Sequence, residues 1–260
     1  MLIEAYGVAA RVDLPQDDAV QAAARDVFPP GWTESKGKPG VHIELLASDD
    51  LLQVKLDGRP MCQPIEMVLA LGVFESQLRF AIAKLAPART FIHAGVVASG
   101  GRAIVLPGHS FAGKTTLVSA LIRQGATYLS DECAVLDADG LVHPYARSLS
   151  VRGPDAKRGT RLEVTTAVSA TSLGAEVADQ ALPIALIATV NYRSGASWNP
   201  EFGTPAEGAL ALMSHAVNAR TAPEETLRLV SAAAEDATVL HGERGDAEQA
   251  AAELLKLLAA

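Results

Sequence analysis

The feature that most constrains this chain is an eight-residue motif, Gly108 to Thr115, with the letters GHSFAGKT. It matches the pattern G-x-x-x-x-G-K-[ST] at every fixed position. Glycine at 108 and 113 permits backbone conformations in which successive N–H groups turn toward one bound anion. Lys114 adds a mobile positive charge, and the Thr115 hydroxyl is a ligand that magnesium accepts. The motif therefore predicts a phosphate-binding loop, or P-loop.

The residues on either side of the motif favour the strand–loop–helix setting that a P-loop needs. Residues 102–107 form a short apolar run, which predicts a strand. Residues 115–124 have apolar positions at helical spacing and end before Gly125, so we expect a helix whose N-terminus faces the loop. A chance match in an ordinary glycine-containing loop would lack this setting. We expect ATP and Mg²⁺ to be bound, with the nucleotide held by Gly108, His109, Ser110, Phe111, Ala112, Gly113, Lys114, Thr115 and Thr116.

An acidic pair, Asp131 and Glu132, follows the next apolar stretch, residues 126–130. This stretch comes directly after the expected helix, so it predicts the next strand of a βαβ unit. In a parallel sheet the end of that strand faces the same crevice as the P-loop. Such acidic pairs are usually solvated turns, but this position favours a carboxylate that serves magnesium or the attacking group. Thr115 is the expected metal ligand of the loop, and Asp131 and Glu132 are candidates either for the metal or for the attacking group.

Two nucleotide-binding classes are disfavoured. Asp137 to Gly140, with the letters DADG, resembles the D-x-x-G motif of GTPases, but it reads better as the turn of a hairpin over residues 135–142. The guanine motif N-K-x-D is absent, and so is the L-S-G-G-Q signature of ABC proteins. The choice between adenine and guanine stays open. His93 lies in an apolar run that predicts the preceding strand, where a lone histidine is more often packed or at the surface than catalytic.

The pattern of apolar residues along the chain changes near residue 89. Residues 1–88 predict strands over 2–12 and 41–56, a helix over 16–27 and a long helix over 64–86 that ends at Pro87. Residues 89–260 alternate short apolar runs with helical stretches, which is typical of an α/β domain. A buried strand is expected over 183–192, helices over 205–218, 223–235 and from 246 onward, and a loop over 147–181. We expect an N-terminal α+β accessory domain, 1–88, and a P-loop catalytic domain, 89–260. The accessory domain either recognises the substrate or only covers one face of the catalytic sheet.

Composition narrows the partners and the compartment. Half of the 260 residues are hydrophobic, at 49%, and the net charge of −8 argues against nucleic acid or an anionic membrane as partners. The chain has two cysteines and no apolar run long enough to span a bilayer. Its first residues lack the basic and apolar regions of a secretory leader. These features predict a cytoplasmic protein without disulfides, and a homo-oligomer is compatible with them.

Three segments together, residues 92–97, 108–115 and 129–132, resemble the catalytic domain of the HPr kinase/phosphorylase family in order and spacing. The detailed similarity covers residues 90–153, and the chain looks closest to the HPr-kinase-related branch with a different N-terminal domain. The resemblance implies a P-loop fold of the HPr kinase and PEP carboxykinase-like type. It also implies that His93 serves the active site, that Asp131 takes the proton of a substrate serine, and that Glu132 helps to hold the metal.

The sequence departs from the family pattern at three places. Phe111 and Ala112 replace smaller or glycine positions, and the second acid is Glu132 where the family usually has aspartate. The family signature Glu-Ile-Arg-Gly is matched only by residues 150–153, with the letters SVRG, which lack its acid. Arg152 is retained, either as a further cation in the active site or as a surface salt-bridge partner. These departures argue against the reverse, phosphorylase reaction and against HPr itself as the substrate.

Two classes of function follow. The first is an ATP- and Mg²⁺-dependent kinase that transfers the γ-phosphate to a serine hydroxyl of a small protein or peptide. A precursor of a ribosomal peptide of the lasso type is an alternative acceptor, because HPr-kinase-related proteins accompany the gene clusters that make such peptides. The second is a non-catalytic binding module that responds to ATP. A well-placed acid at position 131 favours the kinase.

Overall fold

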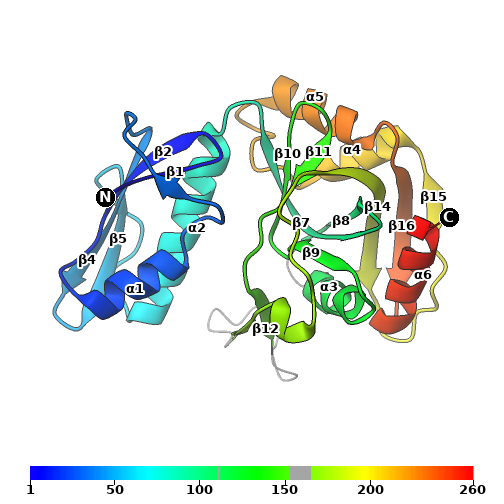
Figure 1. Ribbon diagram of the computed structural model, residues 1–260, viewed down its shortest axis with the longest axis horizontal. Helices are drawn as coiled ribbons and strands as arrows, with labels where there is room; N and C mark the ends of the chain where they lie inside the picture. Colours follow the sequence, from blue (N-terminus) through cyan, green and yellow to red (C-terminus); the bar gives the residue numbers. More distant parts are fainter. Residues whose placement is uncertain (110–111, 153–164, 260) are drawn as a thin grey trace. The chain divides into compact units, whose positions relative to one another are not determined.

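The computed structural model describes residues 1–109, 112–152 and 165–259, and within them the chain is a mixed α/β protein with six helices and several sheets (Figure 1). It divides into two compact units, Met1–Pro87 and Ala88–Ala260. This division lies one residue before the boundary expected from the sequence. None of the described helices has the length and apolar character needed to cross a membrane.

The first unit is a six-stranded sheet packed against a long helix (Figure 1). Alternate residues of its strands, such as Ile43 and Leu45, are buried, and so are Phe74 and Leu78 of the helix. The expected helix over 64–86 begins three residues late, because Ile65 instead forms backbone hydrogen bonds with Leu52 of a strand. The elements are β1 (Leu2–Ala5), β2 (Val8–Asp13), α1 (Asp18–Asp26), β3 (Thr33–Glu34), β4 (Val41–Ser48), β5 (Leu51–Leu56), β6 (Arg59–Pro60) and α2 (Met67–Leu85).

The second unit is built on an eight-stranded sheet in the order β11-β10-β7-β8-β14-β16-β15, with β9 paired to β7. Its strands are β7 (Thr90–Ser99), β8 (Arg102–Pro107), β9 (Thr127–Ser130), β10 (Cys133–Leu136), β11 (Leu141–His143), β14 (Leu182–Tyr192), β15 (Glu201–Gly203) and β16 (Thr238–Arg244). Its helices are α3 (Lys114–Arg123), α4 (Pro205–Ser214), α5 (Pro223–Ala234) and α6 (Ala247–Ala259). The hairpin expected over 135–142 is confirmed, and so are the buried strand and the three C-terminal helices.

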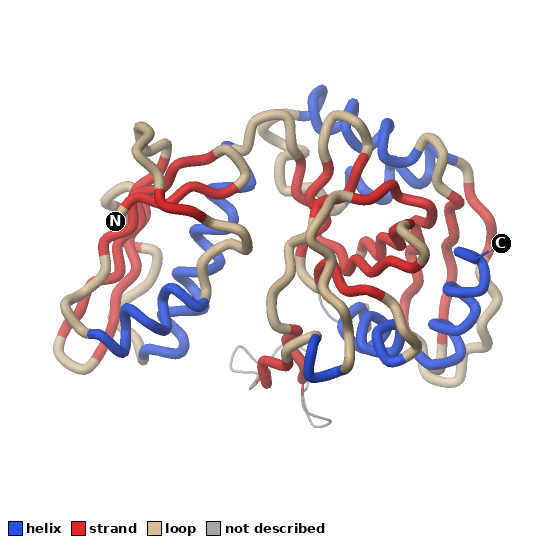
Figure 2. The backbone as a smooth tube through the Cα atoms, in the orientation of Figure 1, coloured by secondary structure: helices blue, strands red, loops and turns tan. Residues whose placement is uncertain are grey.

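Helices cover both faces of this sheet (Figure 2). Alternation along β8 shows the two layers, because Ile104 and Leu106 pack in one buried cluster with α3 and α6. Val105, between them, packs in a second cluster with α4 and α5. The sheet is therefore the middle layer, and the chain that leaves β8 at Pro107 enters α3 on one face of it.

The prediction that the strands before and after α3 are parallel neighbours in a βαβ unit is wrong. β8 and β9 are not adjacent, because β7 lies between them and pairs antiparallel with both. Two strands that are each antiparallel to a third run in the same direction. The C-terminal ends of β8 and β9 therefore still lie at one edge of the sheet, separated by β7, whose residue His93 lies near that edge.

Two stretches expected to lack strands contain them. Residues 147–181, expected as a loop, contain the hairpin β12 (Leu149–Arg152) and β13 (Thr165–Val168) and a short 3-10 helix, Thr171–Leu173. The C-terminal part, expected to be mostly helical, contains β15 and β16. Only Val239 and Leu240 form an apolar run in β16, so the strand has little sequence signal. Its parallel pairing with β14 over seven residues defines it.

Candidate functional site

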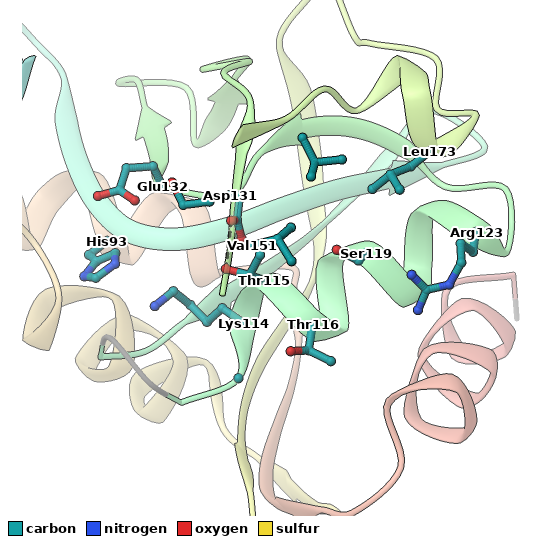
Figure 3. Close-up of a pocket in the computed structure, with 13 residues that line it drawn as sticks. His93, Lys114, Thr115, Thr116, Ser119, Arg123, Asp131, Glu132, Val151 and Leu173 are labelled. Atoms are coloured by element: carbon teal, nitrogen blue, oxygen red, sulfur yellow. Dashed lines mark hydrogen bonds between the residues drawn. The ribbon is translucent and has the colours of Figure 1, made fainter. Parts of the chain in front are cut away.

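A cavity of about 570 Å³ opens at the edge of the sheet where β8 and β9 end (Figure 3). Most of the residues expected from the sequence to act in one site meet in it, although they come from β7, α3 and the turn after β9. The lining residues are His93, Gly113, Lys114, Thr115, Thr116, Ser119, Arg123, Asp131, Glu132, Ser150, Val151, Val168 and Leu173.

The loop between β8 and α3 ends at Gly113, which adopts a left-handed conformation with φ of 84°. This conformation explains the glycine, because residues with a Cβ rarely adopt it. Gly113, the residue at the N-cap position, gives the start of α3 no side-chain hydrogen bond. The first N–H groups of a helix lack partners inside it and carry the positive end of the helix dipole. The start of α3 is therefore suited to an anion.

Lys114 curls back over the loop that precedes it. Its Nζ donates hydrogen bonds to the carbonyl oxygens of Gly108, at 2.8 Å, and His109, at 3.0 Å. The ammonium end lies on the side of the cavity where His93 and Glu132 also point (Figure 3). A positive charge is thus held beside the start of α3, where both the charge and the helix end favour phosphate.

Thr115 and Asp131 are in direct contact. The Thr115 hydroxyl donates a hydrogen bond of 2.8 Å to Oδ2 of Asp131, whose side chain is buried with 8% exposure. The turn that carries Asp131 is stabilised by Ser130, whose hydroxyl accepts from the backbone N–H groups of Glu132, at 3.1 Å, and Cys133, at 2.9 Å. The sequence analysis did not select Ser130, although a serine before an acidic turn is a known local stabiliser.

His93 is connected to the loop through its backbone. Its carbonyl oxygen accepts from the N–H of Gly108, at 3.3 Å, and its N–H donates to the carbonyl of His215, at 2.9 Å. The His215 ring stands edge-on to that of His109, with ring centres 4.5 Å apart. Burial lowers the pKa of His215, and the positive charges of His109 and Lys114 lower it further. Sequence reasoning missed His215, since it follows α4, far along the chain.

Arg244 was also missed, and it lies directly behind the loop. It is 1% exposed, and one terminal nitrogen donates 2.7 Å to the carbonyl of Gly113. The same nitrogen would lie 2.6 Å from a Cβ at position 113, so a side chain there would collide with it. Burial lowers the pKa of Arg244. It ends β16, a strand without a clear sequence signal, so no local pattern could have identified it.

Some expected site residues do not line the cavity themselves, and others lie outside the described residues. The backbone of Ala112 accepts from Tyr192, at 3.3 Å, and donates to His109, at 3.2 Å. Ser110 and Phe111 lie outside the described part of the chain. Arg152 ends β12, two of whose residues line the cavity, but its side chain is not among those described.

The chemistry of these donors fits a nucleoside triphosphate with Mg²⁺. A hydroxyl and carboxylates, from Thr115, Asp131 and Glu132, are the oxygen ligands that Mg²⁺ prefers. Lys114 and the uncapped start of α3 suit the phosphates. No protein-family model matches the chain, and no curated protein matches its sequence.

Proposed function

We propose that this protein binds a nucleoside triphosphate with Mg²⁺ and transfers the γ-phosphate to a serine hydroxyl of a small protein or peptide. The observation that carries the proposal is the 2.8 Å hydrogen bond between Thr115 and Asp131, beside Lys114 at the uncapped start of α3. A metal-binding hydroxyl, a buried carboxylate and a mobile cation are the groups that phosphoryl transfer requires. The resemblance to HPr kinases supports a serine acceptor and a P-loop domain of their type.

One set of residues binds the phosphates and the metal ion and neutralises their charge. Lys114 balances charge on the β- and γ-phosphates, and the N–H groups at the start of α3 hold phosphate oxygens. Thr115, Asp131 and Glu132 would hold Mg²⁺, which neutralises charge that develops during transfer. Arg152 is a further candidate cation. Because the transition state spreads charge over three oxygens, positioning and neutralisation account for most of the expected rate enhancement.

A second set of residues acts on the acceptor. Asp131 is proposed to orient the serine hydroxyl and to accept its proton, because its carboxylate is held in place by Thr115. His93 and Glu132 point toward the same side of the cavity as the Lys114 ammonium (Figure 3), and we expect the acceptor to approach from that side. A binding module without catalysis would need no proton acceptor, so a test of transfer separates the two classes.

The test compares wild-type protein with Lys114→Ala. We expect ATP affinity, measured by titration calorimetry with Mg²⁺, to fall at least about tenfold, because one charge-assisted contact of about 1.5–3 kcal/mol is lost. Phosphate transfer to serine-containing peptides, followed by mass spectrometry, should become undetectable. Lys256→Ala, an exposed lysine of α6, is the matched control and should change neither. Equal affinity and equal transfer in the Lys114→Ala variant would refute the proposal.

A further inference from the structure

A second cavity, of about 660 Å³, lies on the other side of the loop. It shares Gly113 and Thr116 with the first cavity, so the two adjoin at the start of α3. Its other lining residues come from the end of β14 and the loop that follows it, and from the end of β16, the turn that leads into α6 and the first turn of that helix. They are Tyr192, Gly195, Ala196, Arg244, Gly245, Asp246, Ala247, Glu248 and Gln249.

The order of strands places the two cavities on opposite sides of the loop. β8, which leads into the loop, lies between β7 and β14, and β16 follows β14. Asp131, Glu132 and His93 come from the β7 side, whereas Tyr192 and Arg244 come from the β14 and β16 side. A bound phosphate chain whose reacting end faces the acids must therefore leave the loop in the direction of Thr116 and the second cavity.

The second cavity has the wrong chemistry for phosphate. Among its described lining residues Arg244 is the one cation, and its two terminal nitrogens donate to the carbonyls of Gly113, at 2.7 Å, and Gly245, at 3.3 Å. Asp246 adds negative charge, which disfavours phosphate, and its carboxylate can accept hydrogen bonds from sugar hydroxyls. The Glu248 carboxylate is already paired with Arg123 and accepts from Gln124.

The same cavity has the chemistry that a nucleoside needs. The Tyr192 side chain is 56% exposed, and the Arg244 guanidinium lies 5.6 Å from its ring centre, which holds the ring beside the loop. An exposed, held aromatic ring is a surface on which a base can stack.

We infer that the second cavity binds the base and ribose of the nucleotide, with the base stacked on Tyr192. The inference rests on the proposed function, because it assumes that phosphates bind at the start of α3. It extends that function by dividing the nucleotide between two cavities. The β7 side holds the reacting phosphate, and the β14 and β16 side recognises the nucleoside.

The experiment compares two ligands, ATP and inorganic tripolyphosphate, each titrated calorimetrically with Mg²⁺ into the full-length protein. Tyr192→Ala should weaken ATP binding roughly 5- to 100-fold, as expected for loss of one stacked base. Tripolyphosphate has no nucleoside, so its affinity should not change. Tyr192→Phe should bind both ligands like the wild type. Phe202→Ala removes another exposed aromatic ring, 68% exposed on β15, and is the matched control that should alter neither affinity.

The outcomes separate the inference from the proposed function. If Tyr192→Ala binds ATP normally, or if it loses ATP and tripolyphosphate equally, the nucleoside is not held by this ring and the inference is overturned, while phosphate binding stands. Equal affinity of the wild type for ATP and tripolyphosphate would also overturn it. If the wild type binds neither ligand, the proposed function fails, and the inference fails with it.

Discussion

Asp131 and Glu132 are neighbours in the chain, but the structure gives them different surroundings. The Asp131 side chain is buried and accepts the Thr115 hydroxyl. Glu132 is half-buried, and its backbone carbonyl accepts from the N–H of Ala94, at 3.3 Å. The two adjacent acids thus differ in exposure, which is a difference that separate roles would require.

At the scale of single residues we predict different losses for the two acids. Asp131→Asn should keep ATP affinity within a few-fold, because the amide oxygen still accepts from Thr115. Transfer should fall by about 10²- to 10⁴-fold, since an amide cannot accept the proton. Glu132→Gln should mainly raise the Mg²⁺ concentration needed for half-maximal transfer. The measurement is the initial rate of transfer as a function of Mg²⁺ concentration.

These variants also test the assignment against its reverse. Normal turnover in Asp131→Asn would remove that residue as the proton acceptor. The two roles would be exchanged if added Mg²⁺ restored the transfer rate of Asp131→Asn but not that of Glu132→Gln.

At the scale of elements, α3 can pack close to the sheet because Gly95 of β7 has no side chain. A Cβ at this position of β7 would lie 2.6 Å from Cγ2 of Val118, which is buried on α3. Gly95 therefore permits the close approach that brings the start of α3 beside His93 and Asp131. This contact explains a glycine within a strand, where it otherwise costs stability.

We predict that Gly95→Ala lowers the free energy of unfolding of the second unit by about 1–3 kcal/mol, the usual cost of overpacking. In the Val118→Ala background the same substitution should cost much less, because the colliding methyl group is gone. Urea unfolding followed by fluorescence of Trp198, the tryptophan of this unit, measures the four proteins of the cycle. Additive losses would show that Gly95 and Val118 are not coupled.

At the scale of the whole molecule, the proposed chemistry lies in one unit. Every residue that lines either cavity belongs to Ala88–Ala260. The sheet of that unit already has helices on both faces, which weakens the interpretation that residues 1–87 serve only to cover it (Figure 2). The first unit has its own sheet and its own buried residues, including Ile43 and Phe74. We therefore assign to it the choice of acceptor, as a proposal.

We predict that a fragment of residues 88–260 still binds ATP and hydrolyses it slowly, but no longer phosphorylates the natural acceptor. ATP titration, hydrolysis and acceptor phosphorylation are measured on the fragment and on the full chain. Acceptor phosphorylation at the full rate by the fragment would contradict the assignment. An unfolded fragment, detected by circular dichroism, would instead favour a structural role for residues 1–87.

Local patterns in the sequence were sufficient for much of the fold. The glycine-rich motif, the apolar spacing of α3 and the terminating prolines and glycines predicted the elements around the site, since helix and turn formation depend on neighbouring residues. The buried strand β14 and the helices α4 to α6 were predictable for the same reason. The acidic pair was also identifiable, because it directly follows the strand after α3.

Tertiary structure alone decided how these elements meet. The insertion of β7 between β8 and β9 depends on pairing between distant strands, which leaves no local pattern. Arg244 contacts Gly113 across 131 residues of sequence, and its strand has only two consecutive apolar residues. His215 likewise reaches the loop only through folding. The sequence by itself determined the candidate phosphate-binding residues, whereas long-range strand pairing and packing decided which side chains surround them.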